Sequence, residues 1–242
     1  FVELLNRIRT DTLEAGDIAA LNRRYLPGDG VPETGGFSIS LTATNSRADA
    51  INAAHLDALP GKVYCATAVV DGTFTKEYFP TATELRFKKG AQVMLVNNDS
   101  AQRWVNGSIG VIEILARDED SKPYAQVRLE DDGGLVTVTP HRWEVYKFAV
   151  AGDAIISEPV GSFTQFPFRL AWAVTIHKSQ GKTFSQVVID IDRGTFASGQ
   201  MYVALSRCTT FEGIVLKTPV QPQHIRTDPR IVAFMEQHPY LP

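Results

Sequence analysis

Residues 175–181, Thr-Ile-His-Lys-Ser-Gln-Gly, place several hydrogen-bond donors side by side at the end of an apolar run. Hydroxyl, imidazole, ammonium and amide groups are suited to phosphate and ribose contacts, and a glycine lets the backbone approach a ligand closely. The alternative is a solvated helix end, because lysine and glycine are favoured at helix C-termini in any case. The composition of the segment leaves both interpretations open.

A second segment, residues 200–207, reads Gln-Met-Tyr-Val-Ala-Leu-Ser-Arg and predicts a helix with an apolar middle and polar ends. Arg207 follows the apolar stretch. An arginine held at a domain face can reach a nucleotide γ-phosphate across a cleft, and such fingers contribute about 10³–10⁵ in rate. An exposed arginine at a helix C-terminus, where the helix dipole favours it, is the alternative. The position of Arg207 alone favours this alternative.

Other segments are only superficially similar to catalytic or metal-binding motifs. Gly181-Lys182-Thr183 copies the end of a phosphate-binding loop, but that loop requires a glycine five residues before Gly181, where the chain has Ile176. Asp190 and Asp192 follow an apolar strand and are interpreted as an ordinary strand end. The two cysteines lie far apart and form no Cys/His cluster, so we expect no metal site.

Two further regions combine polar groups with turn patterns. Residues 42–47, Thr-Ala-Thr-Asn-Ser-Arg, lie between a predicted strand and a predicted helix, at the sheet edge where α/β sheets bind ligands. Helix capping by Asn45 or Ser46 is the alternative there. Residues 86–98 hold a run of cations followed by a strand, and residues 104–110 contain an Asn-Gly turn. These cations and Trp104 could stack and hold a single strand, or form only a solvated charge run and a turn.

Composition limits the possible classes of protein. A length of 242 residues allows one large domain or two small ones, and 44% apolar residues can bury a sizeable core. The net charge of −3 gives no global attraction to nucleic acid, so any DNA binding requires a local patch. Without a long apolar run or a signal peptide we expect no membrane span. Two lone cysteines suit a reducing compartment, so we expect a cytoplasmic (bacterial) or otherwise intracellular protein.

The periodicity of the apolar residues predicts an α/β domain interrupted by a β module. Short β-like runs at about ten-residue spacing within residues 108–160 predict a small barrel or sandwich. Strands are predicted at 37–41, 62–70, 91–96, 187–191 and 213–217, and helices at 1–9, 17–25, 46–59, 168–178, 198–207 and 229–237.

Residues 175–181 and 200–207 together resemble the last two motifs of superfamily 1 helicases, in particular those of the RecD/Pif family of DNA helicases. The resemblance covers most of residues 37–218. It implies a RecA-like parallel sheet flanked by helices, formed by residues 37–107 and 161–242, with a small SH3-like β-barrel inserted at 108–160. Residues 1–36 then correspond to the closing helices of a first RecA-like domain and a linker.

The same resemblance implies the C-terminal motor half of an ATP-dependent 5′-to-3′ DNA helicase, acting on single-stranded DNA in repair or recombination. Its cofactor is ATP with Mg²⁺, bound mainly by an N-terminal RecA-like domain that this chain lacks, so we expect the chain alone to be inactive. Arg207 is implied as the catalytic arginine finger. The implied nucleotide contacts are Gln180, Gly181, Gln200 and Arg47, and the implied DNA contacts are Thr44, Asn45, Asn106, Gly107, Thr175, His177, Lys178 and Ser179.

Two other hypotheses remain open. The β module, with its acidic loop at 118–120, could belong to a non-catalytic adaptor that binds a basic protein. The same motifs also occur in the helicase part of conjugative relaxases and of recombination nuclease subunits. Because the chain begins with Phe1 within a helical pattern, we expect a segment of a longer protein.

Overall fold

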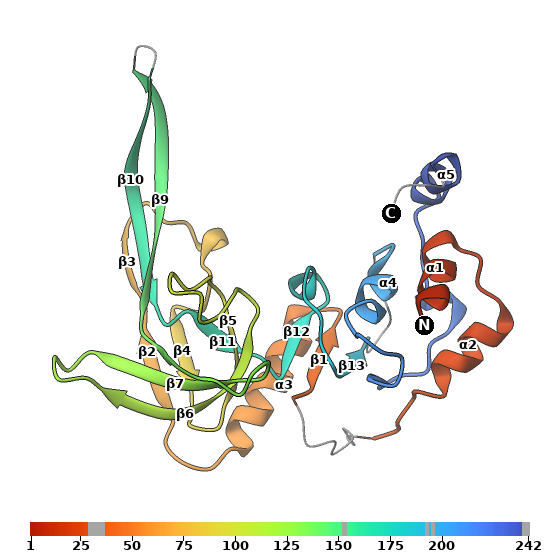
Figure 1. Ribbon diagram of the computed structural model, residues 1–242, viewed down its shortest axis with the longest axis horizontal. Helices are drawn as coiled ribbons and strands as arrows, with labels where there is room; N and C mark the ends of the chain where they lie inside the picture. The colour runs from red at the N-terminus through yellow and green to blue at the C-terminus, as the bar shows by residue number, and fades with distance from the viewer. Residues whose placement is uncertain (29–36, 152–153, 192–193, 195–196, 239–242) are drawn as a thin grey trace. The chain divides into compact units, whose positions relative to one another are not determined.

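The computed structural model describes residues 1–28, 37–151, 154–191, 194 and 197–238. It divides into two compact units, which are treated separately below (Figure 1). Unit 1 comprises residues 1–53 and 172–242, and unit 2 comprises residues 54–171. Among the described residues, no helix has the length and apolar character needed to cross a membrane.

Unit 1 contains a four-stranded sheet in the order β12 (Ala173–Thr175), β1 (Ile39–Thr42), β13 (Val187–Asp190) and β14 (Ile214–Leu216). All of its neighbouring strands are parallel. The strands form because their residues are apolar on both faces, which is the pattern of a parallel sheet covered on both sides. Every residue of β13 is buried, and Leu41 of β1 is fully buried.

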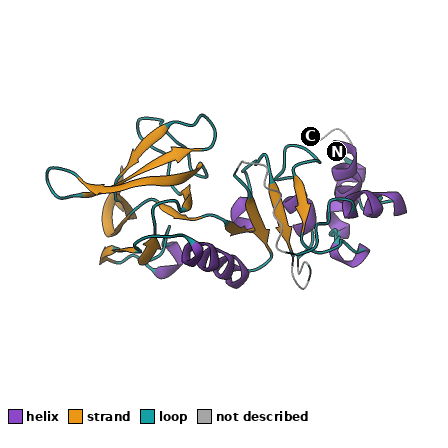
Figure 2. Ribbon diagram, turned by 90° about the horizontal axis from the view of Figure 1, so that it is seen from below, coloured by secondary structure: helices purple, strands orange, loops and turns teal. Residues whose placement is uncertain are grey.

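Helices accompany the parallel strands of unit 1 (Figure 2). Arg7 and Asp17 tie the first two helices together, since Arg7 Nη2 and Nε lie 2.6 and 2.8 Å from the Asp17 carboxylate oxygens. The helix α3 crosses the boundary between the units, and only its residues 45–53 belong to unit 1. The helices are α1 (Val2–Thr10), α2 (Ala15–Asn22), α3 (Asn45–Ala58), α4 (Gln200–Leu205) and α5 (Pro229–Gln237), with short 3₁₀ turns at His177–Ser179 and Pro222–His224.

Unit 2 is built mainly of antiparallel strands in three sheets. A three-stranded sheet has the order β3 (Val69–Gly72), β10 (Ala154–Gln165), β9 (His141–Ala151), and β9 and β10 extend as a long hairpin in Figure 1. The largest sheet has the order β11 (Phe168–Leu170), β5 (Gln92–Leu95), β6 (Ile109–Arg117), β7 (Pro123–Leu129), β8 (Leu135–Val138). The smallest pairs β2 (Tyr64–Thr67) with β4 (Glu84–Phe87), and a 3₁₀ turn spans Lys76–Tyr78.

Packed aromatic rings form part of the core of unit 2. The ring centroids of Phe87, Phe166 and Phe168 lie 5.2–5.6 Å apart. Gly161 allows a close approach next to the irregularity in β10, because a Cβ at this position would lie 2.5 Å from the backbone carbon of Thr73.

The predicted α/β class with a parallel sheet is confirmed, and so is the final helix at 229–237. The predicted helix at 168–178 is wrong, because this segment forms β11, β12 and a 3₁₀ turn. Its aromatic and β-branched residues suit strands, and the pairing of β12 with β1 and of β11 with β5 decides the local structure.

The predicted β module at 108–160 does not form a sheet of its own. Strands β6–β8 continue the sheet that begins with β11 and β5, while β9 and β10 pair with β3. Unit 2 therefore also takes in residues 54–107 and 161–171. The SH3-like barrel and the four predicted domain boundaries stay predictions.

Candidate functional site at the carboxyl edge of the parallel sheet

Three strands of unit 1 end side by side. Thr42, the last residue of β1, pairs with Thr175 of β12 on one side and with Asp190 of β13 on the other. The backbone N–H of Ile176 donates to the carbonyl of Thr42 at 3.0 Å, so the chain segments that leave β1 and β12 start in contact. The carboxyl ends of parallel strands are the usual ligand-binding edge of an α/β sheet. We call this region the sheet edge.

A side-chain hydrogen bond joins the two predicted polar segments at the sheet edge. Lys178 Nζ donates to Asn45 Oδ1 at 2.9 Å, although the two residues are 133 positions apart in the chain. His177, Lys178 and Gln180 are exposed, so their donors face solvent next to this bond. The structure thus brings the 42–47 and 175–181 segments together, as a shared phosphate-binding surface requires.

Arg47 also points to the sheet edge, where it forms an ion pair with Asp190. Arg47 Nη2 and Nε lie 2.8 and 3.0 Å from Asp190 Oδ2. The Arg47 side chain is 49% exposed and that of Asp190 only 9%, so the carboxylate anchors a guanidinium that still reaches solvent. The sequence indicates only an ordinary strand end at Asp190, and no local signal links this residue to Arg47.

The threonine and serine hydroxyls of the site have structural roles in this conformation. Ser179 is fully buried and its Oγ donates to the carbonyl of Ile176 at 2.7 Å, which closes the turn after β12. Thr175 is buried as well. Thr44 Oγ1 accepts the backbone N–H of Arg47 at 3.3 Å, so Thr44 caps α3 in place of the predicted Asn45 or Ser46.

Arg207 is half-buried and its guanidinium is held by three hydrogen bonds. Nε donates to the carbonyl of Val203 at 3.0 Å, Nη1 to the carbonyl of Lys182 at 3.0 Å, and Nη2 to Ser206 Oγ at 2.9 Å. The bond to Lys182 places Arg207 beside the residue that directly follows the 175–181 segment. The predicted arginine and the predicted donor segment are therefore neighbours in unit 1.

Gly181 and Gln200 lie at turns of this region. Gly181 has a φ of +74°, which only glycine adopts readily, and a Cβ there would meet nothing within 4 Å. Gln200 begins α4 directly after Gly199 and its side chain is buried. Both positions belong to the same unit as Arg207.

Asn106 and Gly107 belong to unit 2, in the turn before β6. The backbone N–H of Asn106 donates to Asn98 Oδ1 at 2.8 Å, and that of Gly107 donates to the carbonyl of Leu95 at 2.8 Å. These bonds fix the predicted Asn-Gly turn.

The predicted stacking surface of Trp104 and the adjacent cations is wrong in two respects. Trp104 is only 6% exposed and its Nε1 donates to Asn97 Oδ1 at 3.1 Å, so its ring belongs to the core. Lys88 is buried and its Nζ donates to the carbonyl of Leu59 at 2.6 Å, just after α3. A cation is stabilised at a helix C-terminus by the exposed carbonyls there.

Within the described part of the chain, no three His, Cys, Asp or Glu side chains are grouped so that they could hold a metal ion. Lys178 and Arg47 instead place two cationic side chains at the sheet edge, and Arg207 is a third cation of unit 1, next to Lys182. This arrangement suits the binding of phosphate oxygens rather than of cations.

The chain has the architecture of solved Pif1 helicases. Unliganded Pif1 from Bacteroides sp. superposes on it with a TM-score of 0.85 at 29% sequence identity, and the match covers 99% of this chain and 54% of that one. Human "ATP-dependent DNA helicase PIF1" is 37% identical over 188 residues, which are 76% of this chain and 27% of the relative. The Xenopus laevis protein of the same name is 31% identical over 98% of this chain and 36% of the relative.

The chain belongs to the Pif1 family of helicases. It spans 27% and 36% of the length of these two curated relatives. No protein-family profile matches the chain. Bacteroides Pif1 has also been solved in complex with ADP-AlF4, with a TM-score of 0.82 to this chain, and bound to ssDNA, with a TM-score of 0.76.

Proposed function

We propose that the chain is a motor segment of an ATP-dependent 5′-to-3′ DNA helicase, which supplies an arginine finger and one wall of a single-stranded DNA channel. The observation that carries this proposal is the fixed position of Arg207 against Lys182, next to the donor segment 175–181. The curated relatives named ATP-dependent DNA helicases and the Bacteroides structures with ADP-AlF4 and ssDNA support it.

In this proposal Arg207 approaches the γ-phosphate of ATP bound by a further RecA-like domain. Its charge offsets the negative charge that develops as the phosphoryl group leaves. The three hydrogen bonds that hold the guanidinium reduce the reorganisation needed during the reaction, which favours electrostatic stabilisation of a transition state. Arg47, Gln180, Gly181 and Gln200 complete the nucleotide-facing surface.

The residues present fit a nucleotide better than they fit its metal. Cations at the sheet edge match phosphate oxygens, whereas the described residues lack a carboxylate cluster for Mg²⁺. We therefore assign Mg²⁺ and the phosphate loop to the other RecA-like domain, and expect this chain alone not to hydrolyse ATP. Phosphate release by the isolated chain with single-stranded DNA measures this, and turnover that Arg207→Ala abolishes would contradict it.

The DNA-facing residues follow the sheet edge. Lys178 supplies a charge, and neutral donors and backbone amides complete the phosphate contacts. Ser179 and Thr175 contribute through the turn that they stabilise, because their side chains are buried. The proposed DNA contacts are Thr44, Asn45, Thr175, His177, Lys178 and Ser179 in unit 1, and Asn106 and Gly107 in unit 2.

The test compares Arg207→Ala with Arg23→Ala in the complete protein. Arg23 is exposed at the C-cap of α2, so it controls for loss of an arginine at a helix end. We expect Arg207→Ala to lower DNA-stimulated ATP turnover by about 10³–10⁵, and Arg207→Lys to restore only a part, because lysine cannot make the same three bonds. We expect Arg23→Ala to retain the DNA-stimulated ATP turnover of the parent protein.

Binding of DNA and the thermal unfolding temperature are measured for all three variants. If the Arg207→Ala protein folds, binds DNA and hydrolyses ATP within a few-fold of the parent, Arg207 is not an arginine finger. That result favours the alternative of a non-catalytic adaptor, for which Arg207 has no chemical role.

A further inference from the structure

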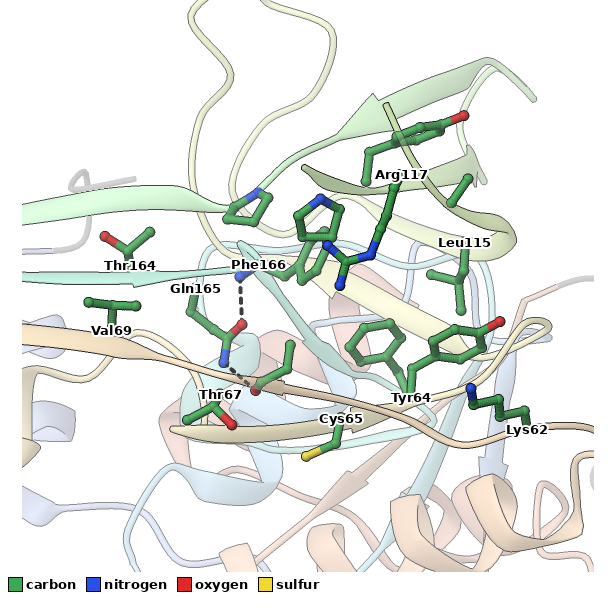
Figure 3. Close-up of a pocket in the computed structure, with 16 residues that line it drawn as sticks. Lys62, Tyr64, Cys65, Thr67, Val69, Leu115, Arg117, Thr164, Gln165 and Phe166 are labelled. Carbon is green, nitrogen blue, oxygen red and sulfur yellow. Dashed lines mark hydrogen bonds between the residues drawn. The ribbon is translucent and has the colours of Figure 1, made fainter. Parts of the chain in front are cut away.

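A cavity with a volume of about 730 Å³ lies within unit 2 (Figure 3). One wall is formed by Lys62 and strand β2, and the opposite wall by the end of β6 and the start of β7. Phe166 and the end of β10 line the part between them. We call this cavity the β2–β7 pocket. None of the polar segments at 42–47, 104–110, 175–181 and 200–207 contributes to it.

The pocket combines exposed cations with aromatic rings and has no carboxylate among its lining residues. Lys62 and Arg117 are exposed, and in Figure 3 the Arg117 side chain extends from its strand into the pocket. Tyr64 is 38% exposed, and Lys62 Nζ lies 5.5 Å from the centre of its ring. Tyr124 is half-buried and also lines the pocket.

The ring of Tyr64 is held in position by the buried ring of Phe87. It stacks on Phe87 with centroids 6.2 Å apart and an interplanar angle of 13°. Phe87 is buried against Phe166 and Phe168, so Tyr64 rests on the core of unit 2. A supported, exposed aromatic ring is the platform on which nucleic-acid bases stack, and basic side chains beside it hold the backbone.

We propose that the β2–β7 pocket binds a nucleobase together with its phosphate, with the base on Tyr64 and the phosphate between Lys62 and Arg117. Lys62 then leaves the face of the Tyr64 ring and pairs with the phosphate. A segment of single-stranded nucleic acid and a free mononucleotide both present this chemistry. The assignment goes beyond the proposed function and does not depend on it, because all of these residues belong to unit 2.

The cations of the pocket determine where a phosphate binds. Lys62 and Arg117 are the cations among the lining residues. The Glu84 carboxylate is on the other face of the β2–β4 pair, where its Oε2 accepts hydrogen bonds from Cys65 Sγ and Thr67 Oγ1 at 3.2 Å each. Arg117 Nη1 donates to the carbonyl of Ser121 at 2.5 Å, and this bond anchors the arginine beside the pocket.

Binding of small probes to the 242-residue chain is measured by isothermal titration calorimetry, and variants of the pocket residues assign the bound probe to the pocket.

Three probes separate the possible sources of the ligand: an oligothymidylate, thymidine monophosphate, and an abasic strand with the same number of phosphates. We expect the oligothymidylate and, more weakly, the mononucleotide to bind, and the abasic strand to bind far more weakly than either; the binding assigned to the pocket is the part that Tyr64→Ala weakens. Binding of the mononucleotide alone identifies a nucleotide site, and tighter binding of the strand identifies a strand site. Equal binding of the abasic strand, or binding of no probe, overturns the proposal.

Variants test the two assigned contacts. Tyr64→Ala is expected to raise the dissociation constant of thymidine monophosphate by about 5- to 150-fold, the range for loss of one base–aromatic stack, while Tyr64→Phe retains binding. Tyr78→Ala, at an exposed tyrosine outside the pocket, is the matched control. Lys62→Gln should weaken binding where Lys76→Gln does not. Binding unchanged by both Tyr64→Ala and Lys62→Gln overturns the assignment even if the chain binds DNA elsewhere.

Discussion

The sheet edge of unit 1 and the β2–β7 pocket of unit 2 both present cations, but in different surroundings. At the sheet edge Lys178 is bonded to Asn45 and Arg47 to Asp190, so each cation has a polar side-chain partner. In the pocket Lys62 lies over the ring of Tyr64, and Arg117 is bonded to the carbonyl of Ser121. Cations among polar side chains suit phosphate contacts, whereas cations beside an aromatic ring suit a base together with its phosphate.

The largest expected effect tests whether the two regions rest on separate cores. Leu41 in β1 and Ile112 in β6 are both fully buried. Leu41→Ala and Ile112→Ala should each lower the free energy of unfolding of their own unit by about 2–5 kcal/mol through lost burial and a cavity. A urea titration followed by the NMR signals of the indole N–H groups reports each unit, with Trp172 in unit 1 and Trp104 in unit 2.

The exposed leucines Leu26 and Leu135 provide controls in units 1 and 2. Their substitution by alanine should change the free energy of unfolding by no more than about 0.5 kcal/mol. If Leu41→Ala shifts the signals of Trp172 and Trp104 by the same amount, the units unfold as one body. The comparison of two independently supported sites then fails.

A smaller expected effect tests whether the sheet edge and the pocket bind their ligands independently. Lys178→Gln removes one cation from the sheet edge and the hydrogen bond to Asn45. It should weaken binding of single-stranded DNA and reduce the salt dependence of binding by about 0.7 in the slope of log K against log salt, the value for one phosphate contact. Fluorescence anisotropy at several salt concentrations measures this.

The matched control for Lys178→Gln is Lys76→Gln, at an exposed lysine of unit 2 outside the pocket. Binding of thymidine monophosphate, assigned to the pocket by its weakening in Tyr64→Ala, should survive Lys178→Gln. An unchanged salt slope would remove Lys178 from the set of DNA contacts. Loss of thymidine monophosphate binding in the same variant would mean that the two regions do not bind independently.

The elements of the sheet could be predicted from the sequence where they carry a local signal. Strand β13 is a continuous apolar run and α5 starts at a proline after the capping residue Asp228, and the predictions for both are close to the observed bounds. The prediction of helix for strand β12 fails because its three residues are specified by pairing with β1 rather than by their own pattern. The full length of strand β10 carries no local signal either.

The predicted polar segments of the sheet edge are brought together, but the bonds that order them are not visible in the sequence. Arg47 and Asp190 are 143 positions apart, and Lys178 and Asn45 are 133 apart. The pocket could not be predicted, because it combines short runs of residues from strands that are far apart in the chain and has no motif. Motifs report residues that act next to one another in the chain, whereas a cavity between sheets depends on the tertiary fold.

The smallest expected effect compares the acid sensitivity of the two units. Hydrogen bonds from Arg7 lower the pKa of Asp17 in unit 1 from 3.8 to about 2, and hydrogen bonds from Arg103 lower the pKa of Asp99 in unit 2 from 3.8 to about 2. A carboxylate whose pKa is lower in the folded state stabilises the fold above pH 3.8, and this contribution is lost as the pH falls toward 2.

Asp17→Asn should therefore remove part of the acid sensitivity of the Trp172 transition and leave that of Trp104 unchanged, and Asp99→Asn should do the reverse. Both ion pairs are partly solvent-exposed, so each effect is small. Urea midpoints at about pH 5 and about pH 2.5 bracket the range in which the carboxylates titrate. If Asp17→Asn changes the pH dependence of the Trp104 signal, the stability of unit 2 depends on the protonation of a residue in unit 1. The sheet edge and the pocket would then belong to parts of the chain that unfold together.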